Sequence, residues 1–354
     1  MGTILISDSR IFDGEKFLQG DILISDGIVT KIADHIEAPA DFRFSARGKT
    51  VLPGLVDIHT HLYGISPPGW SAFADSSCFP FGVTAVADAS ASFGDRTVLD
   101  SFGIKTVVFV IISTKGDRLP FDETERRLEK YGDKAVGIKV CYDTTFNPGL
   151  TSIEPLMQIC EFAHAKGLSV TVHTSNTPIP MAELLSVLEP GDIATHVYHR
   201  GPNSVADDDF ACIHDARKRG VILDIGFCGN LHVDFEILRN AISCGAQPDV
   251  ISTDLVRPAV FTQGGKYGLT MCMSMAKHLG MAEADIFRAV TSSAANALKQ
   301  PWGRLKEGGV ADIAVLELCH EPFDIADKNG YRIQSDMGYR CVLTVSGGNV
   351  VYRR

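Results

Sequence analysis

Short runs of apolar, β-branched residues alternate with amphipathic stretches through the middle of the chain. This alternation is typical of repeated βα units and predicts a parallel sheet. Eight runs have the composition of buried strands: Leu55–Ile58, Val83–Ala87, Thr106–Ile112, Ala135–Val140, Leu168–Val172, Asp192–Thr195, Val221–Ile225 and Val250–Thr253. Helices are predicted between most of them, for example over Asp122–Tyr131, Ile153–Lys166, Asp208–Arg219 and Val233–Cys244. Eight such units predict a closed (β/α)8 barrel, although a doubly wound open sheet gives a similar pattern.

The two ends of the chain follow a different pattern, in which apolar and polar residues alternate around turn signals. The turns are Asp13-Gly14 and Asp26-Gly27 near the N-terminus and Ser346-Gly347-Gly348-Asn349 near the C-terminus, where Ala311–Leu316, Cys341–Val345 and Val350-Val351-Tyr352 are the predicted strands. This pattern is typical of antiparallel hairpins. We therefore predict that residues 1–52 and 301–354 form one small β-sandwich domain beside a TIM-like α/β barrel of residues 53–300. Two unrelated β extensions are the alternative.

Composition narrows the class of protein. The chain has 354 residues, 45% of them hydrophobic, which allows a barrel of about 250 residues and a second domain. A net charge of -10 without a Lys/Arg cluster argues against a nucleic-acid partner. Nine cysteines without a Cys-x-x-Cys pair indicate reduced thiols in a cytoplasmic protein. Without a signal peptide or an apolar run of ~20 residues, no membrane association is expected.

Residues with metal-binding chemistry occur where five of the predicted strands end. They are His59 and His61 on the first strand, Lys139 in the fourth, His173 and His196 after the fifth and sixth, and Asp254 after the eighth. Because the C-terminal ends of barrel strands meet at one face, we expect these side chains to lie together. Four imidazoles, an amine and a carboxylate suit a first-row divalent metal, with zinc as the expected ion. The sequence therefore predicts a metal-dependent hydrolase acting on a small-molecule substrate.

The individual positions differ in how strongly they indicate this chemistry. His59 and His61 point to the same side of a strand and can bind one ion together. Lys139 is surrounded by apolar residues, and burial lowers a lysine pKa by up to ~3–5 units, which makes the neutral amine accessible. A buried ion pair with a carboxylate on a neighbouring strand is the alternative. Asp254 could cap the next helix, but beside an open metal site we expect a general base.

Several short motifs surround these candidate ligands. They are Pro53-Gly54-Leu55-Val56-Asp57-Ile58-His59-Thr60-His61, Gly82-Val83-Thr84-Ala85-Val86, Gly137-Ile138-Lys139, His173, Thr195-His196, Ser252-Thr253-Asp254 and the segment Gly303–Ala314. Together they resemble the amidohydrolase superfamily over nearly the whole chain. Within it the chain is most similar to the dihydroorotase, hydantoinase and D-aminoacylase-like branches, and above all to deacetylase-type enzymes.

The resemblance implies a centre of two divalent metal ions. His59, His61 and Asp254 would bind the more buried ion, and His173 and His196 the more exposed one. Lys139, carboxylated by carbon dioxide, would bridge them as a carbamate. The implied reaction is hydrolysis of an amide, a cyclic amide or an ester by a metal-bridging hydroxide, with Asp254 as general base and then acid.

Two departures from the family pattern narrow the substrate. Deaminases of the superfamily usually carry a glutamate shortly after the histidine of strand five, whereas here residues 174–177 contain no acid. Deamination is therefore not favoured. Dihydroorotases usually have an arginine two residues after the His-x-His, where it binds the substrate carboxylate. Tyr63 occupies that position, which argues against dihydroorotase activity.

The remaining loop residues at the catalytic end are expected to line the substrate pocket. They are Tyr63, Tyr142, Asn176, His199 and Arg257, with Trp70 and Phe227 beside them. Arg257 is the candidate for binding an anionic group, with a solvated loop charge as the alternative. The leading hypothesis is a deacetylase-like hydrolase of an N-acyl or O-acyl small molecule. A hydantoinase-like cyclic-amide hydrolase and a non-catalytic scaffold are the alternatives, and a homo-oligomer stays open because related folds are often oligomeric.

Overall fold

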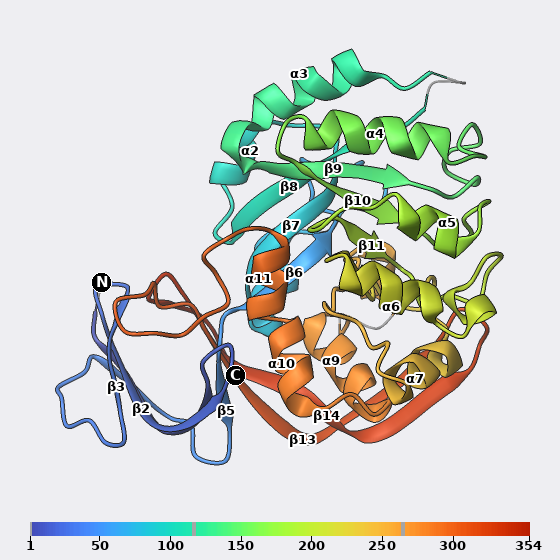
Figure 1. The fold of residues 1–354 in the computed structure, drawn as a ribbon. Helices are drawn as coiled ribbons and strands as arrows, with labels where there is room; N and C mark the ends of the chain where they lie inside the picture. Colours follow the sequence, from blue (N-terminus) through green and yellow to red (C-terminus); the bar gives the residue numbers. More distant parts are fainter. Residues whose placement is uncertain (1, 115–117, 263–265) are drawn as a thin grey trace.

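A curled parallel sheet of seven strands forms the centre of the molecule (Figure 1). The computed structural model describes residues 2–114, 118–262 and 266–354. The strands follow the order β12-β11-β10-β9-β8-β7-β6. Their bounds are β6 Leu55–Thr60, β7 Val83–Ala91, β8 Lys105–Ile112, β9 Ala135–Cys141, β10 Ser169–His173, β11 Ile193–Thr195 and β12 Ile222–Asp224. Each begins within one residue of a strand predicted from the apolar runs, so the repeated βα pattern is confirmed.

The predicted eighth strand, Val250–Thr253, does not form a ladder. Its segment lies between the two edge strands, where one isolated bridge joins Val250 to β12 and another joins Leu255 to β6. Asp254 has a φ of 49°, a left-handed conformation that interrupts an extended run. The sheet is therefore curled as in a TIM-like barrel, but it is not closed by an eighth regular strand.

Helices cover the outer side of this sheet (Figure 1). Their bounds are α1 Ala74–Cys78, α2 Arg96–Asp100, α3 Phe121–Tyr131, α4 Glu154–His164, α5 Met181–Ser186, α6 Ala211–Lys218, α7 Phe235–Ser243, α8 Arg257–Thr262, α9 Leu269–His278, α10 Glu283–Ala289 and α11 Ser292–Ala297. The four helices predicted by example correspond to α3, α4, α6 and α7. In α7 the Asp234 side chain accepts a hydrogen bond from Ile237 N (2.9 Å), which caps the helix and sets its start.

The two ends of the chain meet in a second, mixed sheet. Its order is β15-β14-β13-β5-β1-β2-β3, with β4 also paired to β1. The bounds are β1 Ile4–Phe12, β2 Phe17–Ser25, β3 Ile28–Ala33, β4 Phe42–Ser45, β5 Thr50–Pro53, β13 Ile313–Ala326, β14 Arg332–Ser346 and β15 Asn349–Arg353. Because β5 pairs with both β1 and β13, strands from the two termini share one continuous sheet. The expected second domain made from both termini is therefore present, and its strands form one mixed sheet.

The β13–β14 hairpin extends well beyond the short strands predicted in the C-terminal segment. It remains paired from Ile313 opposite Val345 to Ala326 opposite Arg332, and its far part lies along the helical region (Figure 1). The turn is held there because Lys328 N donates to the Val233 carbonyl (3.1 Å). The C-terminal segment therefore reaches the same end of the parallel sheet as the candidate ligands.

Packing follows the two sheets. One large apolar cluster joins the parallel strands to the surrounding helices, and a smaller cluster fills the sheet made from the termini. A third cluster packs residues of β6, β7 and β8 against α11. Within the described ranges, none of the helices is both long and apolar enough to cross a bilayer.

Candidate metal centre

The six predicted ligand residues lie together at the C-terminal end of the parallel strands. Asp254 is central, with Oδ1 2.9 Å from His61 Nε2 and 3.4 Å from His59 Nε2. Lys139 Nζ lies 3.3 Å from His59 Nε2. The His173 and His196 rings are 4.5 Å apart, and His196 Nε2 is 3.9 Å from Asp254 Oδ2. All six residues line one cavity of about 510 Å³.

Left-handed backbone at two strand ends turns His196 and Asp254 into this cavity. Their φ angles are 65° and 49°, which are unfavourable for residues other than glycine and occur preferentially at functional sites. Gly226 supports the same arrangement with a φ of 53°. A Cβ atom there would lie 2.3 Å from His196 Nδ1, so glycine is the residue that fits.

Hydrogen bonds on the far side of two rings fix their tautomers. His196 Nδ1 must donate, because its partner is the Gly226 carbonyl (2.7 Å). The Thr195 hydroxyl donates to Asp224 Oδ2 (2.7 Å) and therefore accepts from His59 Nδ1 (3.1 Å). In each neutral ring, a proton on Nδ1 leaves a lone pair on Nε2. Outer partners that orient an imidazole in this way are typical of metal-binding histidines.

His61 is oriented by a separate hydroxyl network. Its Nδ1 lies 2.6 Å from Ser90 Oγ and 3.2 Å from Ser66 Oγ. The Ser66 hydroxyl donates to the buried carboxylate of Asp88 (2.9 Å). Asp88 also accepts from the backbone N–H groups of Leu62 and Ser90, at 2.7 and 2.9 Å. Three polar groups therefore bind this carboxylate, and among the described residues no ion pair joins it to Lys139.

Burial sets the charge of the cluster. Desolvation lowers the pKa of His59 to about 4 and lowers the pKa values of His173 and His196. It also lowers the pKa of Lys139. For Asp254, burial raises the pKa, but the contacts with His59 and His61 outweigh it and hold the pKa well below its usual value. Neutral imidazoles and an ionised carboxylate are the protonation states that bind metal ions.

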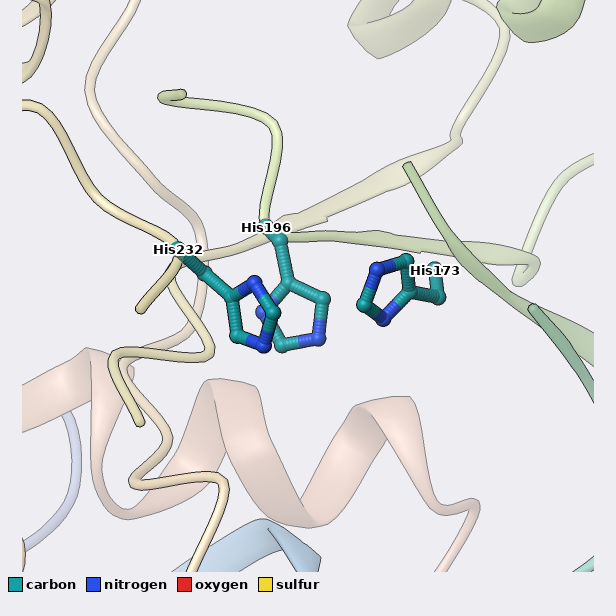
Figure 2. Close-up of side chains that lie close together, drawn as sticks. All are labelled: His173, His196 and His232. Atoms are coloured by element: carbon teal, nitrogen blue, oxygen red, sulfur yellow. The ribbon is translucent and has the colours of Figure 1, made fainter. Parts of the chain in front are cut away.

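A fifth imidazole, His232, joins the cluster and was not identified from the sequence (Figure 2). Its Nδ1 lies 2.9 Å from Ser175 Oγ and its Nε2 3.5 Å from Asp254 Oδ2. Its ring centroid is 4.1 Å from that of His196 and 4.9 Å from that of His173. His232 lies in the loop between β12 and α7, well beyond the strand end, so reasoning from strand ends could not identify it.

A second unpredicted residue, Lys328, comes from the turn of the β13–β14 hairpin. Its Nζ donates to Asn176 Oδ1 (2.7 Å), and Asn176 Nδ2 donates to Asp143 Oδ2 (2.9 Å). All three residues line the cavity. The position of Lys328 depends on the length of the hairpin, which the sequence pattern underestimated.

Asn176 is the one of the five predicted substrate-binding residues that lines the cavity. Tyr142 follows Cys141, and strand alternation turns it to the opposite side, where it is fully buried and its hydroxyl donates to the Ser152 carbonyl. His199 is also fully buried, and its Nδ1 accepts from Gly201 N (3.0 Å). Both side chains are buried in the core, as is that of Phe227, which was expected beside the pocket. None of these three residues lines the cavity.

Tyr63 and Arg257 also lie outside the cavity, for the opposite reason. Tyr63 is 56% exposed and packs against Phe73, with ring centroids 5.4 Å apart. The Arg257 guanidinium is exposed and donates to the Gly69 carbonyl (2.7 Å). The alternative weighed for Arg257, a surface loop charge, matches this placement.

Apolar side chains form most of the remaining cavity wall. Trp70, which was expected to lie beside the pocket, lines it together with Phe146, Leu231 and Val256. The Trp70 and Phe146 rings are 6.2 Å apart, and Phe146 contacts the His173 ring at 5.8 Å. The cavity therefore combines a polar, ligand-rich floor with an apolar mouth that suits a small organic molecule.

Imidazoles, a lysine and an aspartate thus meet in one cavity at the strand ends of a curled parallel sheet, an arrangement that suits a metal-dependent hydrolase. The chain belongs to the amidohydrolase family, whose model matches residues 50–351. It is 28% identical over 341 residues to a deacetylase of Agrobacterium fabrum, covering 88% of this chain and 81% of that protein. It is 24% identical to a dihydroorotase of Anaeromyxobacter sp. (strain K), covering 99% and 98%.

Solved structures show the same fold. A dihydroorotase superposes with a TM-score of 0.85 at 23% identity, covering 100% of this chain and 98% of that one. An adenine deaminase superposes with a TM-score of 0.84 at 22% identity, covering 99% of both. The family membership, with relatives named deacetylase and dihydroorotase, identifies the chain as a hydrolase. It also argues against the non-catalytic scaffold.

Proposed function

We propose that this hydrolase uses two divalent metal ions, zinc being the expected metal, to cleave the amide or ester bond of an N-acyl or O-acyl small molecule. The observation that carries the proposal is the convergence of His59 Nε2 and His61 Nε2 on one oxygen of Asp254, at 3.4 and 2.9 Å. His61 Nε2 can donate a hydrogen bond to that oxygen, whereas His59 carries its proton on Nδ1, so its Nε2 lone pair repels the oxygen unless a cation lies between them. The donor set therefore fits a divalent metal ion.

His59, His61 and Asp254 would hold one ion, and His173 and His196 the other, with carboxylated Lys139 between them. The buried Lys139 supports this role, because its lowered pKa favours the neutral amine that reacts with carbon dioxide. When bound, such ions lower the pKa of water to about 7 and polarise a carbonyl group. Asp254 stays ionised at neutral pH and can accept a proton at a carboxylate oxygen, then return it to the leaving nitrogen or oxygen.

The cavity supports an open-chain substrate with one apolar and one anionic group. Trp70, Phe146 and Leu231 provide an apolar surface at the mouth. Lys328 places an ammonium on that rim, with one donor used on Asn176. A substrate carboxylate could take one of its remaining donors. The similarity to deacetylases, and Tyr63 in place of an arginine, also favour open acyl compounds over dihydroorotate.

The test is a matched substrate panel with the zinc-loaded, bicarbonate-treated protein. N-acetylphenylalanine, its uncharged amide, an acetyl ester of a 2-hydroxy acid and 5-benzylhydantoin separate charge, bond type and ring closure. We expect turnover of the acetylated acids, with much weaker turnover of the amide. Turnover confined to the hydantoin would replace this proposal with a cyclic-amide hydrolase.

Lys328→Met tests the anionic group. A hydrogen bond to a charged group contributes about 1.5–3 kcal/mol, so KM for the acetylated acids should rise at least about 10-fold. KM for the uncharged amide should change little. Lys16→Met removes an exposed lysine far from the cavity and serves as the matched control. Equal effects of Lys328→Met on the acid and on the amide would contradict carboxylate recognition.

A further inference from the structure

Three imidazoles form a compact group within the centre (Figure 2). His173, His196 and His232 each offer one ring nitrogen, and the three nitrogen atoms lie within 4.8 Å of one another. Lys139 contacts His59 instead, and within the described part of the chain no hydrogen bond joins it to any of these three rings. The group therefore offers three ligand nitrogens without any atom of Lys139.

The loop that carries His232 is fixed on both sides of this residue. Before it, Cys228 N donates to the Thr253 carbonyl (2.8 Å), and Cys228 has a φ of 50°. After it, the Val233 carbonyl accepts from Lys328 N (3.1 Å), and Asp234 N donates to the Tyr198 carbonyl (2.8 Å). A strained backbone held by long-range hydrogen bonds is typical of a functional loop rather than of a free connection.

The two ring nitrogens of His232 face the Ser175 hydroxyl and the Asp254 carboxylate. His232 shares a single hydroxyl with His173, because Ser175 Oγ lies 2.9 Å from His232 Nδ1 and 2.7 Å from His173 Nε2. The hydroxyl donates its one proton to one of these nitrogens and accepts from the other when that nitrogen is protonated. If His232 donates from Nδ1, its Nε2 keeps a lone pair that is available to a metal ion.

We propose that His232 is a third imidazole ligand of the ion assigned to His173 and His196, and that these three histidines bind this ion even when Lys139 carries no carbamate. The inference rests on the proposed function in that it assigns one of its two ions. Three histidines with an open fourth position are an established ligand set for catalytic zinc. Carbon dioxide would then control loading of the second ion at His59, His61 and Asp254, but not of the first.

Metal binding tests this directly and needs no substrate. Metal-free protein in bicarbonate-free buffer is titrated with Co²⁺, with a competing chelator and the visible absorption of Co²⁺ as readouts. Wild type and Lys139→Ala should each bind one equivalent tightly. Losing an outer partner of a ligand typically costs ~10–100-fold in metal affinity, so losing a ligand in His232→Ala should cost at least about 100-fold. His320→Gln, which removes an imidazole that is 82% exposed, should leave the affinity unchanged.

The possible outcomes separate this inference from the proposed function. Unchanged Co²⁺ affinity and absorption in His232→Ala, or one-equivalent binding that disappears in Lys139→Ala, would overturn the three-histidine site alone. Wild-type protein that binds no divalent ion with or without bicarbonate would overturn both. Circular dichroism and thermal unfolding of the metal-free variants check the fold, and His232→Gln, which keeps a polar side chain, decides the matter if the alanine variant is unfolded.

Discussion

A methyl group added at Gly226 should displace His196 from the metal centre. The new Cβ would lie 2.3 Å from His196 Nδ1 and 2.5 Å from Thr195 Oγ1, so both side chains must move. Overpacking of this kind costs about 1–3 kcal/mol. The φ of 53° adds about 1–2 kcal/mol for a residue with a Cβ. We therefore expect Gly226→Ala to destabilise the metal-free protein by about 2–5 kcal/mol and to weaken metal binding strongly.

Gly229→Ala is the matched control in the same loop. Gly229 has a φ of 67°, but the nearest atom to its added Cβ is Ala259 Cβ at 3.6 Å, an ordinary contact. This variant should show the backbone cost of about 1–2 kcal/mol and retain its Co²⁺ affinity. Urea unfolding of the metal-free proteins and Co²⁺ titration measure both quantities. Equal stability and equal metal affinity in the two variants would refute the role assigned to the close approach at Gly226.

Three further predictions concern single side chains. Asp254→Asn should retain metal but lose turnover by about 10²–10⁴-fold; unchanged kcat/KM would remove Asp254 from the mechanism. Lys139→Ala should keep one ion and lose the other, with partial rescue by acetate, whereas a full content of two ions by elemental analysis would argue against a carbamate. Burial lowers the pKa of His199 from 6.5 to about 3, so below pH 6.5 protons bind the unfolded chain preferentially and wild type loses stability. Below pH 6.5, the free energy of unfolding of wild type should fall relative to that of His199→Gln by about 1.4 kcal/mol per pH unit. Urea unfolding measures this difference, and a difference that does not change with pH would contradict the prediction.

The strand-end ligands could be predicted because they depend on short-range order. His59, Lys139 and His173 lie in regular strands, where the apolar run locates the strand and its end locates the catalytic face. The same reasoning misplaced Tyr142, although the alternation that brings Cys141 to the cavity turns the next residue away from it.

The residues that were missed depend on long-range contacts. Lys328 reaches the cavity because β13 and β14 are long, yet the far part of β13 alternates between exposed and partly buried positions and has no strong apolar run. His232 is placed by backbone hydrogen bonds from distant segments, which no local pattern records. The predicted eighth strand forms isolated bridges to β12 and β6 instead of a ladder, and pairing with these two edge strands is likewise a long-range contact.

The most direct test of the account is a zinc titration of the metal-free protein in bicarbonate, following hydrolysis of the acetylated acids. We predict that turnover appears only as zinc binds and reaches its full value at two equivalents. Turnover that is independent of bound metal, or two bound ions without hydrolysis of any open acyl compound in the panel, would contradict the assignment of this chain as a binuclear metal-dependent acyl hydrolase.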